Sequence, residues 1–97
     1  MTVARLYRMV AAEGREQALL DALTDLERLV RPLDGCTGVE LLRDARKPGS
    51  FVFIEKWTSI EAHKAAGSAL PKDTLGPVMA ALANPPEGAY LDYLIGT

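Results

Sequence analysis

Phe51-Val52-Phe53-Ile54-Glu55-Lys56-Trp57 is the stretch of sequence that decides the fold. Its aromatic and β-branched residues follow a Pro-Gly-Ser turn and predict a β-strand. Because side chains of a strand alternate between its two faces, Phe51, Phe53, Glu55 and Trp57 share one face. A carboxylate among aromatic rings is costly to bury unless it has a partner, meets water or has a raised pKa. We therefore expect a partly apolar pocket for a small ligand over this face.

Composition limits the functions open to this chain of 97 residues. The length fits a single domain, expected over residues 1–97, with one modest core. A net charge of -2 and the lack of a basic cluster argue against nucleic acid as a partner. The one cysteine, Cys36, permits no internal disulfide, and no segment approaches the about 18 apolar residues of a membrane span. We therefore expect a cytoplasmic protein without a membrane partner.

Hydrophobic periodicity predicts four strands and three helices along the chain. Residues between Arg15 and Val30 carry an apolar stripe at helical spacing, and Thr58 with Glu61 fits a capping box before a second, shorter helix. The expected strands cover residues 2–10, 36–44, 51–57 and 89–95, and the expected helices cover residues 15–30, 59–66 and 74–83.

This order of elements is typical of the α+β class with a ferredoxin-like, split βαβ fold. Such a fold places its helices on one face of a four-stranded antiparallel sheet and leaves the other face uncovered. Val52 and Ile54 would then be exposed together with apolar residues of neighbouring strands. An exposed apolar surface of this kind favours a homodimer in which the two sheets pack face to face.

Three segments carry a more specific pattern: Gly35-Cys36-Thr37-Gly38-Val39-Glu40-Leu41-Leu42-Arg43-Asp44, then Pro48-Gly49-Ser50 with the strand that follows, then Ser59-Ile60-Glu61-Ala62-His63. Together they resemble the antibiotic biosynthesis monooxygenase (ABM) domain family. The resemblance implies a dimeric α/β barrel with a pocket in each subunit between sheet and helices. It also implies a cofactor-independent monooxygenase that oxidises a small aromatic phenol, quinol or anthrone to a quinone with O₂. No flavin, haem or metal is expected.

The resemblance extends to individual site positions. In quinone-forming members of the family, a Trp, a Tyr six residues later and an Asn four residues before the Trp line the pocket. The corresponding residues here are Trp57, His63 and Phe53. His63, the one histidine, has an ordinary pKa suited to accepting a proton near neutrality. We expect His63, Trp57 and Glu55 to be catalytic and Phe51, Phe53 and Tyr7 to bind the substrate.

Each of these assignments has a structural alternative. Trp57 could simply cap the core, His63 could lie on the surface, and Glu55 could only hold the fold together. The chain would then be a non-catalytic dimeric module that binds a small apolar molecule or has an accessory role. The related haem-degrading branch is not favoured, because an early Asn, a Trp at position 66 and a second His are all missing. The single histidine and scattered carboxylates also show no metal-site spacing.

Overall fold

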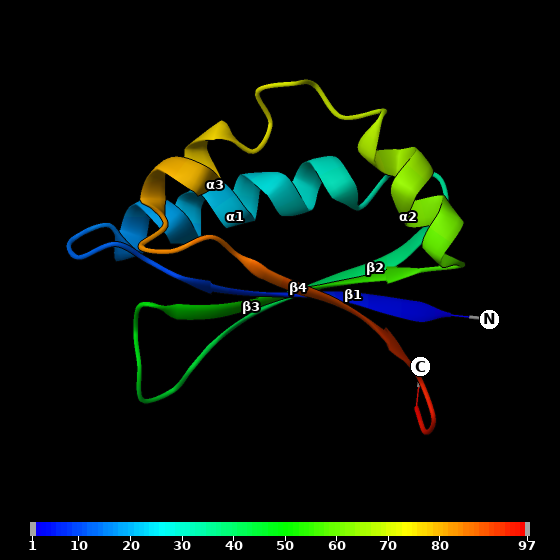
Figure 1. Ribbon diagram of the computed structural model, residues 1–97, viewed down its shortest axis with the longest axis horizontal. Helices are drawn as coiled ribbons and strands as arrows, with labels where there is room; N and C mark the ends of the chain where they lie inside the picture. Colours follow the sequence, from blue (N-terminus) through cyan, green and yellow to red (C-terminus); the bar gives the residue numbers. More distant parts are fainter. Residues whose placement is uncertain (1, 97) are drawn as a thin grey trace.

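The computed structural model describes residues 2–96, and its elements follow the predicted order (Figure 1). They are β1 (Val3–Val10), α1 (Glu16–Val30), β2 (Cys36–Arg43), β3 (Ser50–Trp57), α2 (Ile60–Gly67), α3 (Gly76–Ala81) and β4 (Glu87–Asp92). The strands form one antiparallel sheet in the order β2-β3-β1-β4. This is the predicted α+β, ferredoxin-like arrangement of a split βαβ fold.

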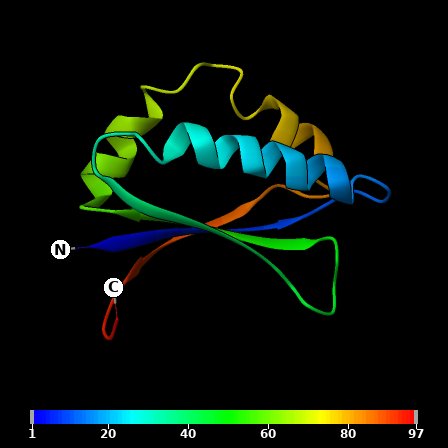
Figure 2. The same ribbon diagram turned by 180° about the vertical axis from the view of Figure 1, so that it is seen from behind.

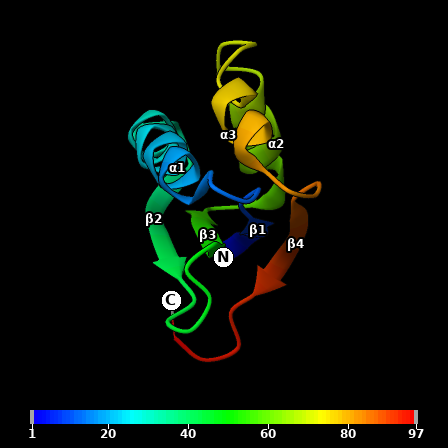
Figure 3. The ribbon, with the colours of Figure 1, turned by 90° about the vertical axis from the view of Figure 1, so that its left-hand side faces the viewer.

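All three helices lie on one face of the sheet (Figures 1 and 2). Seen end-on, α1 and α3 lie side by side above the strands, and no helix of residues 2–96 covers the opposite face (Figure 3). Each helix that the structure describes is too short or too polar to cross a membrane. The sheet therefore has one face packed against helices and one face that these residues leave open.

Strand β3 alternates between buried and partly exposed residues along its whole length. Phe51, Phe53 and Trp57 are at most 2% exposed and point towards the helices, as predicted. They pack with Leu19 and Leu23 of α1, which are fully buried. Burying an apolar side chain of this size stabilises the fold by roughly 1.5–3 kcal/mol, so this contact between β3 and α1 forms the centre of the core.

Several of the predicted boundaries are wrong. The N-cap of α2 is Ser59, whose hydroxyl oxygen accepts the Ala62 N–H at 3.0 Å, and not Thr58. The Thr58 N–H donates to the Gly35 carbonyl oxygen at 2.9 Å, so it is not available to the Glu61 side chain, as the predicted capping box requires. The last strand is Glu87–Asp92 rather than residues 89–95, because its pairing with β1 runs from Glu87 opposite Arg8 to Asp92 opposite Val3.

The third helix is shorter than the predicted 74–83 and comprises Gly76–Ala81. Proline lacks an amide hydrogen and is best tolerated in the first helical turn. Pro77 lies in that first turn, so the helix begins directly before it. The preceding residues, 68–75, form the connection that arches over the sheet between α2 and α3 (Figure 1).

Replacing Gly35 by alanine is expected to destabilise the protein by about 3 kcal/mol. Gly35 has φ +87°, and a Cβ atom there would lie 2.7 Å from the Cβ of Ala62. Gly14→Ala is the matched control, because Gly14 has φ +76° but no atom within 4 Å of the added carbon. It should cost only about 1 kcal/mol. Urea unfolding measures both values, and equal losses would contradict the predicted steric contact.

Candidate active site

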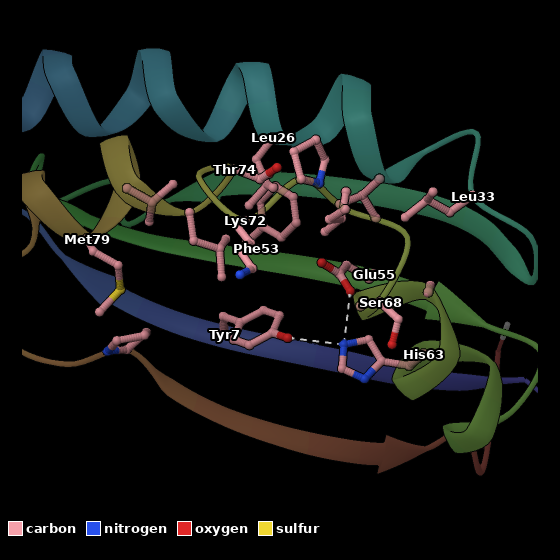
Figure 4. A pocket seen from close by; sticks show the side chains of 18 of the residues that line it. Tyr7, Leu26, Leu33, Phe53, Glu55, His63, Ser68, Lys72, Thr74 and Met79 are labelled. Carbon is pink, nitrogen blue, oxygen red and sulfur yellow. Dashed lines mark hydrogen bonds and ion pairs between the residues drawn. The ribbon is translucent and has the colours of Figure 1, made fainter.

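A cavity of about 530 Å³ lies between the sheet and the helices (Figure 4). Its volume falls within the about 300–1,000 Å³ typical of small-molecule sites. Most of its wall is apolar and comes from every layer of the fold, including Met9, Leu26, Val30, Phe53, Trp57 and Val78. The connection between α2 and α3 supplies a further part of the wall. A small, largely apolar ligand therefore suits the cavity by both size and lining.

Three polar side chains meet at one part of this pocket: Tyr7 from β1, Glu55 from β3 and His63 from α2 (Figure 4). The Tyr7 hydroxyl lies 3.2 Å from Nε2 of His63. The same Nε2 atom lies 3.6 Å from Oε1 of Glu55. Burial is the main cause that raises the pKa of Tyr7, which therefore stays protonated at neutral pH. The cluster thus combines a phenol, an imidazole and a carboxyl group at an apolar cavity.

The buried carboxyl group of Glu55 has a hydrogen-bond partner on the same strand face, the indole of Trp57. It is 5% exposed, and its Oε1 accepts the indole N–H of Trp57 at 2.9 Å. Burial raises the pKa of Glu55, while the hydrogen bond from Trp57 and the charge of Arg5 oppose that rise. The Trp57 ring also meets the His63 ring edge-on, with centroids 5.5 Å apart. Trp57 therefore donates a hydrogen bond to Glu55 and also packs against the imidazole of His63.

Arg5 brings a positive charge next to this cluster. Its guanidinium lies over the rings of Tyr7 and Tyr90, 4.8 Å and 4.4 Å from their centroids. The two phenol rings therefore stabilise it by cation–π interactions, while its Nε is buried without a hydrogen-bond partner among residues 2–96. Gly88 makes room for the group, since a Cβ there would lie 2.6 Å from Nη2 of Arg5.

The surroundings of His63 lower the pKa of its imidazole, so the ring is neutral near pH 7. Its side chain is 19% exposed. Burial is the main cause that lowers the pKa of His63, and the charges of Arg5 and Lys64 lower it further. A neutral imidazole has one nitrogen free to accept a proton.

Five of the six side chains predicted for the site line this one pocket: Tyr7, Phe53, Glu55, Trp57 and His63. Phe51 is the exception. It is 2% exposed, belongs to the core and lines a separate cavity of about 480 Å³. Although Phe51 shares a strand face with Trp57, the strand carries it about 20 Å further along the sheet.

Sequence reasoning missed several groups at the pocket. Tyr90 belongs to no motif of the sequence, yet its hydroxyl lies 2.7 Å from Nδ1 of His63. Its position follows from the pairing of Tyr90 with Arg5 across β1 and β4, a register that the sequence alone did not supply. Lys72 and Thr74 line the pocket from the irregular connection after α2, and no sequence pattern marks them. Thr74 Oγ1 is buried and has no hydrogen-bond partner among the described residues.

The family profile described as "Antibiotic biosynthesis monooxygenase" matches residues 2–69 of the chain. The chain belongs to this family. Its ABM fold is shared with SnoaB, a cofactor-independent oxygenase from Streptomyces nogalater, at a TM-score of 0.85 and 20% identity, covering 98% of this chain and 95% of that one. No curated protein sequence matches the chain significantly.

Two other solved structures have the same ABM fold. A Mycobacterium tuberculosis protein matches with a TM-score of 0.83 and 23% identity over 99% of this chain and 98% of its own. A candidate antibiotic biosynthesis monooxygenase from Bordetella bronchiseptica matches with a TM-score of 0.85 and 18% identity, covering 97% and 98%. The fold is thus retained almost end to end at low identity.

The imidazole of this ABM protein should make the fold sensitive to mild acid. The pKa of His63 is lowered from 6.5, so just below that pH the unfolded chain binds more protons than the folded one. The free energy of unfolding should therefore fall as the pH drops through about 6.5.

Urea unfolding at about pH 7.5 and about pH 5.5 measures this loss, and His63→Gln should show less of it. The raised pKa of Glu55 makes the free energy of unfolding change with pH in the opposite direction. Because the unmodified protein and His63→Gln both contain Glu55, the difference between their pH dependences reports the contribution of the imidazole. An identical pH dependence in both proteins would contradict the lowered pKa of His63.

Proposed function

We propose that this ABM protein is a cofactor-independent monooxygenase that oxidises a small aromatic phenol, quinol or anthrone to a quinone with O₂. One observation carries the proposal: a largely apolar cavity of about 530 Å³ has a neutral imidazole and a phenol in its wall. The similarity of the fold to SnoaB, itself a cofactor-independent oxygenase, supports the same reaction class. The chemistry requires a bound flat ring, a proton acceptor and shielding from water.

In the proposed reaction, the aromatic ring lies against Phe53 and Trp57 with its hydroxyl directed at His63. Nε2 of His63 accepts the hydroxyl proton, and Glu55, 3.6 Å from that nitrogen, stabilises the imidazolium that forms. The electron-rich phenolate then transfers one electron to O₂, and the resulting radical pair combines at a ring carbon. With a phenol or anthrone, the outer oxygen of this peroxide leaves as hydroxide together with the hydrogen of the same ring carbon, and the hydroxide takes the proton held by His63 to form water. One oxygen atom of O₂ thus enters the quinone and the other leaves as water.

Trp57 has a positioning role in this scheme as well as forming a wall. Its indole N–H donates to the carboxyl oxygen of Glu55 that faces His63. Removing that donor would leave a buried carboxyl oxygen less well satisfied, which is costly in an apolar surrounding. Trp57 therefore keeps Glu55 beside the imidazole during the proton transfer.

A non-catalytic dimeric module that binds a small molecule is the second candidate function. The observation in its favour is Phe53, which stands where quinone-forming relatives carry an Asn and adds no polar group to the pocket. Ligand binding and turnover separate the two candidates. Binding is measured by the fluorescence of Trp57, the one tryptophan of the chain, which lines the cavity.

We also propose that the open sheet face pairs with a second copy of the chain. Apolar residues from all four strands lie on that face, namely Val10, Leu42, Val52, Ile54 and Leu91. Beyond β4, Leu94 and Ile95 are more than 90% exposed and add further apolar surface nearby. Burying such surface against a partner is favourable, as in other homodimers.

The enzymatic proposal predicts O₂ uptake above the autoxidation rate with at least one anthrone, naphthol or quinol. His63→Ala should lower kcat by about 100-fold or more, because a positioned base contributes about 10²–10⁴-fold. Trp57→Phe should lower kcat less, since it keeps an aromatic wall but loses the hydrogen bond to Glu55. An oxygen electrode with metal-free protein gives these rates.

Glu61→Ala is the matched control, because Glu61 is exposed on the same helix as His63 and does not line the cavity. Its rate should equal that of the unmodified protein. Turnover that survives in His63→Ala would remove His63 as the proton acceptor. Fluorescence quenching by the ligands without any O₂ uptake would favour the binding module.

The dimer proposal predicts that Ile54→Asp converts the protein into a monomer. Ile54 lies at the middle of the open face, paired with Leu6 of β1 and Glu40 of β2, so a carboxylate there would have to lose its water on association. Leu29→Asp is the control, since Leu29 is equally apolar and 45% exposed on α1. Light scattering after gel filtration gives the masses, and a dimeric Ile54→Asp variant would exclude this face as the interface.

A further inference from the structure

Both ring nitrogens of His63 are engaged by phenol groups from opposite sides. Nε2 lies 3.2 Å from the hydroxyl of Tyr7, which lines the cavity. Nδ1 lies 2.7 Å from the hydroxyl of Tyr90, which does not line it. The shorter contact is thus with the tyrosine that does not line the cavity, and it comes from β4, the strand at the edge of the sheet.

The rings of His63 and Tyr90 also constrain each other. Their centroids are 5.4 Å apart with the planes at 77°, an edge-on contact that fixes the direction of the imidazole. The guanidinium of Arg5 also lies over the Tyr90 ring, 4.4 Å from its centre. The Tyr90 ring is therefore held in place independently of the hydrogen bond that its hydroxyl makes.

A neutral imidazole carries its hydrogen on only one nitrogen, so its two partners must differ in role. If Nδ1–H donates to the Tyr90 oxygen, the lone pair of Nε2 faces Tyr7 and the cavity. If Nε2 carries the hydrogen, the nitrogen facing the substrate cannot accept a proton. A base therefore needs a third group that selects the correct tautomer, as in other acid–base sites.

We propose that Tyr90 is the positioning residue of this site: its hydroxyl oxygen accepts Nδ1–H of His63 and so keeps the lone pair of Nε2 on the side of Tyr7 and the cavity, where a substrate hydroxyl would bind. The inference rests on the proposed monooxygenase function and names the residue that orients its base. It assigns no contact with substrate to Tyr90. The proton that Nε2 receives stays on His63 until it is returned to the departing hydroxide as water forms.

A tyrosine hydroxyl at Nδ1 suits the proposed role of His63, because this base must release the proton that it accepts from the substrate. The charged and titratable groups around His63 are Arg5 and Tyr7 from β1, Glu55 from β3, Tyr90 from β4 and Lys64 on its own helix. A carboxylate at Nδ1 would stabilise the imidazolium strongly, whereas the hydroxyl oxygen of Tyr90 accepts a hydrogen bond without bringing a carboxylate to Nδ1. Glu55 alone supplies a carboxyl group, on the Nε2 side.

Tyr90→Phe tests the proposal because it removes only the hydroxyl and keeps the ring that contacts His63 and Arg5. With a substrate found by O₂ uptake, kcat at pH 7 should fall on the order of tenfold, part of what a positioned base contributes. KM and the ligand affinity measured by Trp57 fluorescence should stay within about twofold, since Tyr90 lies outside the cavity wall. Tyr93→Phe is the matched control and should leave kcat unchanged, because no hydrogen bond joins Tyr93 to His63 within residues 2–96.

A second readout does not depend on turnover. His63 is the one histidine of the chain, so its two ring nitrogens can be followed by ¹⁵N NMR without further assignment. We expect the Nδ1–H tautomer to dominate above pH 7 in the unmodified protein and in Tyr93→Phe. Tyr90→Phe should contain an increased share of the Nε2–H tautomer.

The two readouts separate this inference from the proposed function. An Nε2–H tautomer in the unmodified protein, or a tautomer that Tyr90→Phe leaves unchanged, overturns the role of Tyr90 even if the protein turns over substrate. The expected tautomer shift without O₂ uptake by any substrate upholds the role of Tyr90 at His63 and removes the monooxygenase. A fall in kcat with an equal rise in the ligand dissociation constant would indicate a distorted cavity and also overturns the inference.

Discussion

The buried carboxyl group of Glu55 is the constraint on which the arrangement of the site depends. An acidic group at 5% exposure is costly unless it has polar partners, and Glu55 has the indole N–H of Trp57 at 2.9 Å and the imidazole of His63 at 3.6 Å. One partner comes from the same strand, and the other comes from the helix that follows it. Satisfying the carboxyl group therefore brings α2 against β3 and places an imidazole at the wall of an apolar cavity.

The division of the sheet into two faces determines where chemistry and association are possible. On the helix side, α1 packs closely over Phe51 and Phe53, while the connection between α2 and α3 arches over a cavity near Trp57. On the other side, strand residues of the opposite parity remain exposed, Leu42 among them. Side chains of a strand alternate between the two faces of the sheet. The odd-numbered residues of β3 therefore line the core and the pocket, and its even-numbered residues form part of the open face.

Much of the fold and part of the site could be predicted from local patterns. The period of the hydrophobic residues identified α1 and β3, and the alternation in β3 put Phe53, Glu55 and Trp57 on one face, as the structure has them. Local patterns failed where a distant segment decides the outcome. The capping box expected of Thr58 and Glu61 does not form, because the Thr58 N–H that Glu61 would have to accept donates to the carbonyl of Gly35, in the turn before β2. Likewise, β4 ends at Asp92 because its partner strand begins at Val3.

By itself, the sequence determined the order of the elements, the composition of each strand face and the presence of one histidine, one tryptophan and a carboxylate among aromatic residues. These properties depend on spacing along the chain, which is local. The tertiary structure alone decided that Tyr7, Tyr90 and Arg5 surround His63, and that Phe51 lies away from the pocket. The contacts of Tyr90 and Tyr7 with His63 join residues 27 and 56 positions apart, and they depend on strand register and helix docking, which no local pattern specifies.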